Sequence, residues 1–243
     1  MNKIFFLMIL IVSTLSLLGS CAKDDDAAST TAATSANLAG TGTTPSGTIT
    51  GNDNLTGTFH TSWNGQEPSG GCVDNSSALS AHSYLASDTK SFKKMWIVTG
   101  SSSFTDSEVQ YSDTDCTTMT AYFNRMADNV TIGSALTGLT AGSSPAFPTT
   151  ANKMSYVVTK YSLMANTSGT ISNFSTRFSQ TMTSGEEKQI DESSPSTEYT
   201  IFAAGDTTCS TSQAKKCLYI NDSSAADNLT DWVSGDRNTW WQE

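Results

Sequence analysis

The two histidines, His60 and His82, are the side chains of this 243-residue protein best suited to acid–base or metal chemistry. Neither belongs to a recognisable catalytic pattern. A Ser-His-Asp hydrolase of the α/β type places its serine in a G-x-S-x-G turn, and the sequence contains no such run. The zinc motif HExxH and the glycine-rich phosphate loops are also absent from the sequence. We therefore predict ordinary fold positions for both histidines, no catalytic residue, no metal site and no cofactor.

Acidic side chains gather in two places, and carboxylates are the ligands that a hard cation such as Ca²⁺ prefers. One group comprises Asp106, Glu108, Asp113 and Asp115, and the other comprises Glu186, Glu187, Asp191 and Glu192. Neither group follows the residue order of an EF-hand loop. We expect solvated loops at both places.

Cys21 offers a different chemistry, the covalent attachment of lipid. It follows Lys3 and an apolar stretch over residues 4–18, which is shorter than a membrane-spanning helix and typical of a secretory signal. The residues Leu18-Gly19-Ser20-Cys21 resemble the bacterial lipobox. This resemblance implies cleavage before Cys21, acylation of the cysteine, and a mature protein anchored by lipid in the outer membrane.

The residues after the cysteine, from Lys23 to Asp26, read K-D-D-D. They resemble the signal that sends lipoproteins of Bacteroidota to the cell surface, which implies surface display. The alternative is a solvated charge run at the start of a tether, with the protein facing the periplasm.

Four further cysteines, Cys72, Cys116, Cys209 and Cys217, form an even set in a chain expected to be exported. Such sets usually form disulfides. Four cysteines allow three pairings, and we favour Cys72–Cys116 with Cys209–Cys217, because the second pair brackets a predicted turn. The alternatives are four reduced cysteines or a metal site, and the spacing lacks the close C-x₂-C pairs that metal sites usually show.

Three segments organise the chain. Residues 1–20 form the predicted signal peptide. Residues 21–54 hold the lipidated cysteine and a tract rich in Ser, Thr, Ala and Gly, which buries too little apolar surface to fold and is expected to be a disordered tether. Residues 55–243 are long enough for one folded head with a sizeable core.

The head consists of short segments in which apolar and polar residues alternate, separated by clusters of Gly, Asn, Asp and Ser. This pattern predicts an all-β fold of antiparallel strands, either a barrel or a β-sandwich. The segments cover residues 56–63, 92–100, 107–113, 117–126, 154–164, 197–205 and 216–222. Residues 77–85 and 173–182 are ambiguous and could form one or two short helices.

Parts of the head resemble the small calycin barrels of bacterial lipoproteins, a group that includes the lipocalins. The resemblance lies in Gly57-Thr58-Phe59, in YSDTDC at residues 111–116, and in LYI at 218–220 ahead of Arg237. It implies an up-and-down barrel with an internal cavity. It also implies that Arg237 packs over Phe59 or Trp63 where the barrel closes.

The net charge and the tryptophans indicate which classes of partner the protein can bind. The net charge is −10 and the isoelectric point is about 4.5, which disfavours nucleic acid. Trp63 and Trp96 fit core positions, whereas Trp240 and Trp241 either close one end of the barrel or form an exposed patch.

Together these features predict a lipid-anchored envelope protein with a non-catalytic role, either in binding or in structure. Its expected partners are the membrane, through the anchor, and a small apolar ligand in the barrel or another envelope protein. The rival class is an envelope hydrolase whose active site the sequence does not reveal.

Overall fold

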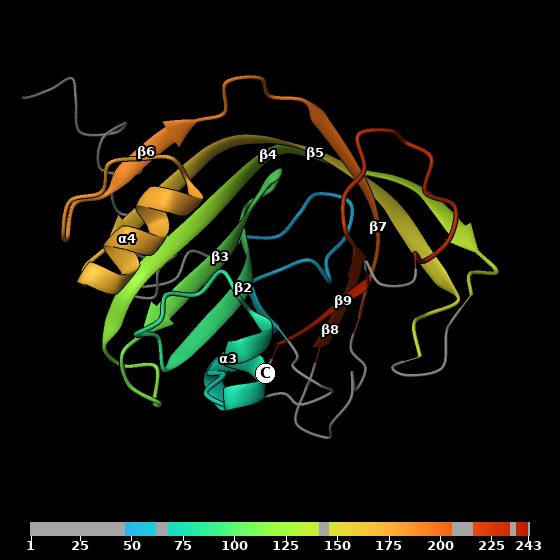
Figure 1. Cartoon of the computed structure of the whole chain (residues 1–243). Coiled ribbons are helices and arrows are strands. Elements are labelled where there is room, and N and C mark those ends of the chain that lie inside the picture. The colour runs from blue at the N-terminus through green and yellow to red at the C-terminus, as the bar shows by residue number, and fades with distance from the viewer. Residues whose placement is uncertain (1–46, 62–67, 141–145, 206–215, 234–236, 243) are drawn as a thin grey trace, which may run out of the picture.

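The computed structural model describes residues 47–61, 68–140, 146–205, 216–233 and 237–242. About half of these residues belong to β-strands, which curve round a common centre (Figure 1). The strands are β1 (Thr58–Thr61), β2 (Ser91–Gly100), β3 (Ser103–Tyr111), β4 (Met119–Thr137), β5 (Thr150–Ala165), β6 (Lys188–Asp191), β7 (Thr197–Gly205), β8 (Lys216–Asn221) and β9 (Arg237–Gln242). The helical elements are η1 (Ser69–Gly71), α3 (Ser76–Ala81) and α4 (Ser168–Arg177).

The sheet closes on itself. β1 pairs with β2 on one side and with β9 on the other. β4 pairs with β5, so the strands form a closed ring, and each strand in it is antiparallel to both of its neighbours. The result is an eight-stranded antiparallel barrel, β1-β2-β3-β4-β5-β7-β8-β9. The predicted all-β barrel is therefore confirmed, and the β-sandwich is not formed.

The ninth strand, β6, pairs with the same strand as β7, namely β5, but at a different part of it. β5 is long enough for both, because β6 pairs with residues 160–163 and β7 pairs with residues 152–157. The two strands act as one interrupted strand, and the break at residues 192–196 contains Pro195, which cannot donate a ladder hydrogen bond.

One end of the barrel is closed by the segment just before β1. Its side chains Ile49 and Leu55 are fully buried and pack with Val98 and Val130 of the barrel interior. Its backbone is held by a hydrogen bond from the amide of Gly47 to the carbonyl of Val98, 2.9 Å long. The packed head thus extends back at least to residue 47, eight residues before the boundary placed at residue 55 from composition.

Alternation along the strands separates an inner from an outer face. The inner cluster of buried side chains is mostly aromatic and branched, and includes Phe59, Trp96, Val98, Phe104, Met154, Tyr156, Val158, Phe202, Leu218, Ile220 and Trp240. Trp240 and Trp241 are consecutive in β9, so they point to opposite faces. Trp240 joins this inner cluster and Trp241 packs outside with Phe147 and Trp232. Both are at most 5% exposed, so they form no exposed patch.

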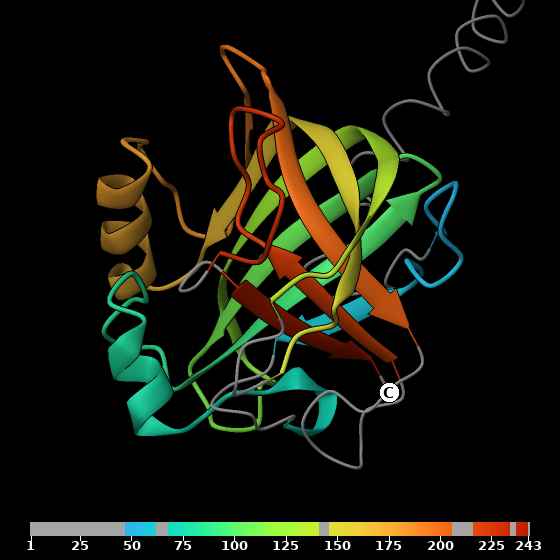
Figure 2. The ribbon, with the colours of Figure 1, turned by 90° about the vertical axis from the view of Figure 1, so that its right-hand side faces the viewer.

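Both ambiguous segments are helical in their first half, residues 77–81 and 173–177, as one of the two interpretations predicted. α3 begins after Asn75, whose side chain accepts a hydrogen bond from the amide of Ala78. α4 begins with a capping box in which Thr167 and Thr170 exchange hydrogen bonds. α4 lies beside the wall formed by β4 and β5, and α3 lies beside β2 (Figures 1 and 2).

The predicted disulfide between Cys72 and Cys116 is present, with Cα atoms 5.8 Å apart. It ties the segment before α3 to the loop between β3 and β4. Cys217 is fully buried in β8 and is disulfide-bonded as well. Cys209 lies outside the described residues, so the second pairing stays a prediction.

The segments predicted to carry the signal, Cys21, the K-D-D-D run and most of the tether also lie outside the described residues. Within the described ranges, no helix has the length and apolar character needed to cross a membrane.

Candidate functional site

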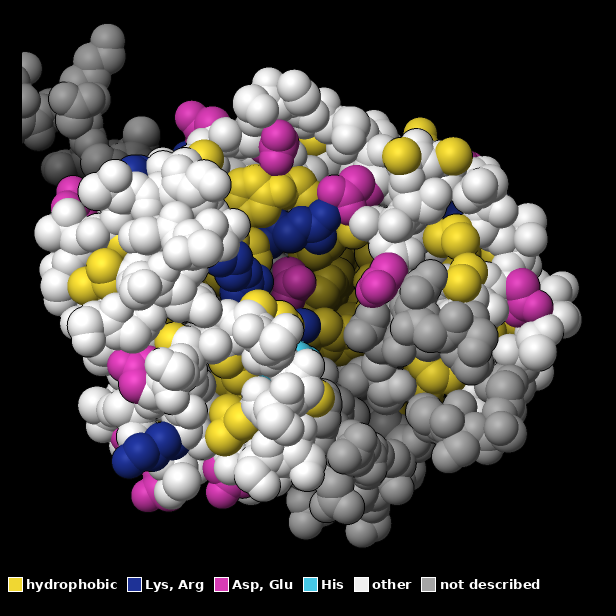
Figure 3. All heavy atoms as spheres, in the orientation of Figure 1, with side chains coloured by type: hydrophobic (Ala, Val, Ile, Leu, Met, Phe, Trp, Pro, Cys, Tyr) yellow, Lys and Arg dark blue, Asp and Glu magenta, His cyan; other side chains and the backbone are white. Residues whose placement is uncertain are grey.

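A cavity of about 290 Å³ opens at the barrel end opposite the segment that contains Ile49. Figure 3 shows this hollow on the face that also carries α3 and α4, with hydrophobic side chains in its depth and charged side chains round its rim. Six strands and the loop after β8 supply its lining, which consists of Lys94, Trp96, Phe104, Asp106, Arg125, Tyr156, Ile220, Asn221, Asp222, Ser223 and Trp240.

Four aromatic rings form the deep part of the cavity. Trp96 and Phe104 are stacked, with ring centres 4.5 Å apart, and Tyr156 meets Phe104 edge-on at 4.9 Å. Trp240 completes the set from β9. Each ring is at most 5% exposed, so a ligand in the cavity would lie against preformed and rigid aromatic walls.

Arg125 at the cavity rim forms an ion pair with Glu198, so both charges have partners within the protein. The guanidinium of Arg125 donates to both carboxylate oxygens of Glu198 at 2.6 Å, and Ser223 donates to the same carboxylate. Burial alone would raise the pKa of Glu198, but the hydrogen bonds from Arg125 and Ser223 outweigh it and hold that pKa below its ordinary value. This pair joins β4 to β7 and fixes the shape of the opening.

Two other rim residues have no such partners. Within the described residues, the side chains of Lys94 and Asp106 form no hydrogen bond and no ion pair, although both line the cavity. Burial alone would lower the pKa of Lys94, but the nearby carboxylates of Asp106, Glu108 and Asp222 raise it overall. Lys94 therefore carries a full positive charge at neutral pH, on a side chain that the protein leaves available.

The expectation of solvated loops is wrong for the first two residues of the first acidic group. Asp106 and Glu108 belong to β3, and alternation turns both toward the barrel interior. Glu108 is only 4% exposed and lies 3.3 Å from the guanidinium of Arg177 in α4. Asp113 and Asp115, by contrast, do lie in the loop between β3 and β4.

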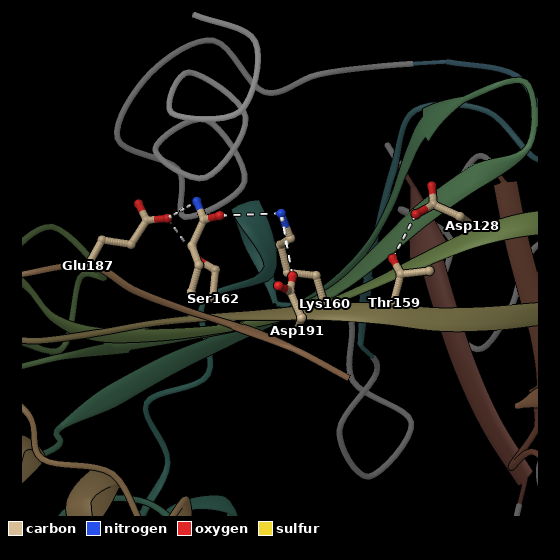
Figure 4. Close-up of polar contacts among 7 residues, drawn as sticks. Asp128, Thr159, Lys160, Ser162, Glu187 and Asp191 are labelled. Carbon is tan, nitrogen blue, oxygen red and sulfur yellow. Dashed lines mark hydrogen bonds and ion pairs between the residues drawn. The ribbon is translucent and has the colours of Figure 1, made fainter. Parts of the chain in front are cut away.

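The second acidic group lies on the outside of the barrel, around β6. Glu187 accepts a hydrogen bond from Ser162 at 3.4 Å, and Asp191 lies 3.9 Å from the ammonium of Lys160 (Figure 4). These contacts attach β6 to β5. No group of histidine, cysteine or carboxylate side chains in the described part of the chain is arranged to hold a metal ion.

Neither histidine lines the cavity. His60 lies on the outer face of β1, with its ring 5.5 Å from that of Trp241. His82 ends α3 and packs edge-on against Phe92 at 4.9 Å, and burial lowers its pKa. Both therefore occupy packing positions in the fold.

The structure describes only part of the predicted contact between Arg237 and Phe59 or Trp63. Phe59 is fully buried inside the barrel, edge-on to Trp96 at 6.1 Å. Arg237 begins β9, the strand that pairs with β1. Trp63 and the side chain of Arg237 lie outside the described residues, so the predicted contact between arginine and ring stays a prediction.

Sequence reasoning did not identify Lys94, Asp106 or Arg125 as site residues. A signal was nevertheless present, because alternation in FKKMWIVTG puts Lys94 on the same face as Trp96, and alternation in SFTDSEVQ puts Asp106 on the same face as Phe104. A charged residue in register with buried aromatics indicates a polar interior position.

Comparison of the chain with protein-family models and with curated proteins found no match.

Proposed function

We propose that this protein is a lipid-anchored envelope protein whose barrel binds a small, largely apolar ligand without transforming it. The observation that carries the proposal is the cavity of about 290 Å³ walled by Trp96, Phe104, Tyr156 and Trp240. Binding pockets are typically concave, mostly apolar and preformed, with a few polar groups that orient the ligand.

The size of the cavity sets the size of the ligand. At ~30 Å³ per water molecule in the liquid, this space corresponds to roughly ten waters. A compound with one or two rings matches that volume, whereas a long acyl chain exceeds it. The resemblance of the sequence to calycin barrels supports the same function, since it implies an internal cavity.

The anchor places this binding head at the membrane surface. The lipobox-like residues before Cys21 support acylation, and acyl chains contribute ~0.8 kcal/mol per buried CH₂. We expect the Cys21→Ala variant to lose metabolic labelling by radioactive palmitate. Equal labelling of the variant and the wild type would contradict the lipoprotein assignment.

A substitution that fills the cavity tests the binding function. The lipidated protein in phospholipid nanodiscs is titrated with N-phenyl-1-naphthylamine, a neutral fluorescent probe, with empty nanodiscs as the blank. Ile220→Trp places a larger side chain in the cavity and should abolish the saturable signal. Val233→Trp adds the same ring at a surface position, 38% exposed, and should leave the signal unchanged.

Two results would overturn the proposal. One is the absence of saturable binding to the wild type. The other is equal binding by wild type and Ile220→Trp, once circular dichroism shows that both are folded. Chemical conversion of a bound compound would favour the rival class, a hydrolase.

A further inference from the structure

The cavity rim contains more charge than an apolar ligand needs. Four of its lining residues are charged, namely Lys94, Asp106, Arg125 and Asp222. Taking charged groups out of water is costly unless they are paired. The way each charge is paired therefore indicates what the ligand has to supply.

The side chain of Arg125 already has a partner within the protein. Both oxygens of Glu198 accept its hydrogen bonds at 2.6 Å, and its guanidinium also lies 5.9 Å from the ring centre of Tyr156. A ligand anion at Arg125 would have to displace Glu198, a charge-assisted and bidentate partner. Arg125 therefore shapes the site rather than recognising the ligand.

The side chains of Lys94 and Asp106, by contrast, form no ion pair within the described residues, although the carboxylate of Asp106 attracts the ammonium of Lys94 over a longer distance. They come from the neighbouring strands β2 and β3, where Trp96 is paired with Asp106 and Lys94 with Glu108. The two side chains are thus diagonal neighbours on the inner face, above the stacked rings of Trp96 and Phe104. Their separation exceeds the limit for an ion pair, since among the described residues no such pair joins them.

We propose that the cavity takes a small aromatic zwitterion, with its anionic group at Lys94, its cationic group at Asp106 and its ring against Trp96 and Phe104. This inference rests on the proposed binding function and names the ligand class. A simple carboxylate would satisfy Lys94 but leave Asp106 unpaired and meet its repulsion. A simple amine would do the reverse.

Four indole compounds separate these cases with one ring system. They are tryptophan, a zwitterion; tryptamine, a cation; indole-3-acetate, an anion; and indole, which is neutral. Isothermal titration calorimetry on the nanodisc-anchored protein should rank tryptophan as the tightest, by roughly tenfold over each of the others, because it alone gains both charge-assisted hydrogen bonds.

Variants of the two rim residues test the assignment of each end. Lys94→Met should weaken tryptophan by roughly tenfold without weakening tryptamine, and Lys94→Arg should restore most of the loss. Asp106→Asn should weaken tryptophan and tryptamine without weakening indole-3-acetate. The matched control is Lys93→Met, because Lys93 is the adjacent lysine of β2 and does not line the cavity.

The outcomes distinguish this inference from the function on which it rests. If N-phenyl-1-naphthylamine binds but tryptophan binds no better than indole, the zwitterion inference is wrong and the binding function stands. Equal affinities of wild type and folded Lys94→Met for all four compounds would also overturn the inference. If no probe binds at all, the proposed function itself fails.

Discussion

Two cations lie over the inner face of the same barrel, and the protein treats them differently. Arg177 of α4 is 3.3 Å from Glu108 and lies over the rings of Tyr84, Phe178 and Phe123 at 4.7, 4.8 and 5.2 Å. The side chain of Lys94 in β2 has no hydrogen bond, ion pair or ring partner within the part of the chain that the structure describes. The first region, here called the α4 cluster, pairs its cation with Glu108 and with three aromatic rings. The second region, the cavity, leaves the cation of Lys94 without such a partner among the described residues.

The difference separates structure from function. A polar group that the chain satisfies contributes to stability, and its loss is felt in folding. A polar group left without a partner inside a pocket does not stabilise the fold, because its burial costs free energy, and a bound ligand can supply the missing partner. Substitutions in the α4 cluster should therefore change stability, whereas matched substitutions in the cavity should change binding.

The largest effect is expected from Phe174→Ala in the α4 cluster. Phe174 is fully buried and meets Phe178 edge-on at 5.2 Å. Truncating a buried phenylalanine typically costs about 3–5 kcal/mol through lost transfer energy and the cavity left behind. Urea unfolding measures this loss. Ser172→Ala, at an exposed position of the same helix, should change the stability by less than ~0.5 kcal/mol.

Phe174→Ala also tests whether the α4 cluster and the cavity act independently. Phe174 does not line the cavity, so folded Phe174→Ala should bind the naphthylamine probe as wild type does. A loss of binding in the folded variant would mean that the α4 cluster and the cavity form a single functional unit.

Much of the fold follows from the sequence, because alternation and turn residues are local signals. The strand regions around Trp96, Val109, Tyr156 and Leu218 each show the period of two that a strand requires. The choice between barrel and sandwich depends on whether β1 meets β9, a contact between the two ends of the head. No local pattern encodes such a contact.

The candidate site was harder to predict for a physical reason. Alternation in SEVQY separates Val109 and Tyr111 from Glu108 and Gln110, but it does not say which pair faces inward. In a barrel with an occupied core, the apolar pair would be inside. Here Glu108 and Gln110 are inside and hydrogen-bonded to each other at 2.9 Å, while Val109 is fully buried on the opposite face.

Arg177→Met is expected to have the second largest effect. It removes the guanidinium from Glu108, whose side chain is only 5% exposed, and leaves a buried carboxylate without its ion-pair partner. Removing one partner of a buried pair costs up to 3–5 kcal/mol, but Arg177 is partly exposed and the expected loss is about 1–2 kcal/mol. A double-mutant cycle with Glu108→Gln isolates the pair. A coupling energy near zero would show that Arg177 acts through its aromatic contacts alone.

Lys94→Met, the matched change in the cavity, should cost less than ~1 kcal/mol in urea unfolding, because it breaks no hydrogen bond or ion pair of the described residues. The remaining loss comes from the attraction between the ammonium and the carboxylates of Asp106, Glu108 and Asp222. The contrast with Arg177→Met sharpens the comparison. Equal losses for both variants would remove the distinction between a satisfied and an available cation.

The smallest expected differences concern two glutamates whose pKa values move in opposite directions. In the α4 cluster, burial raises the pKa of Glu108 above its ordinary value of 4.5, against the opposing effect of Arg177. At the cavity rim, burial of Glu198 is outweighed by Arg125 and Ser223, and its pKa falls below 4.5. Each glutamine variant mimics the protonated form of its residue, so its stability relative to wild type reports the charged state.

The signs follow from proton linkage. Native Glu108 binds a proton more readily than the unfolded chain does, so the wild type gains stability as the pH falls from the raised pKa to 4.5. Native Glu198 binds a proton less readily, so the wild type loses stability as the pH falls from 4.5 to the lowered pKa. Measured from their values in acid, the stability of Glu108→Gln relative to wild type should rise toward neutral pH, and that of Glu198→Gln should fall. Urea unfolding between pH 3 and pH 7 measures both. Changes of the same sign would mean that the two carboxylates share one kind of environment, which would contradict the difference between the α4 cluster and the cavity rim.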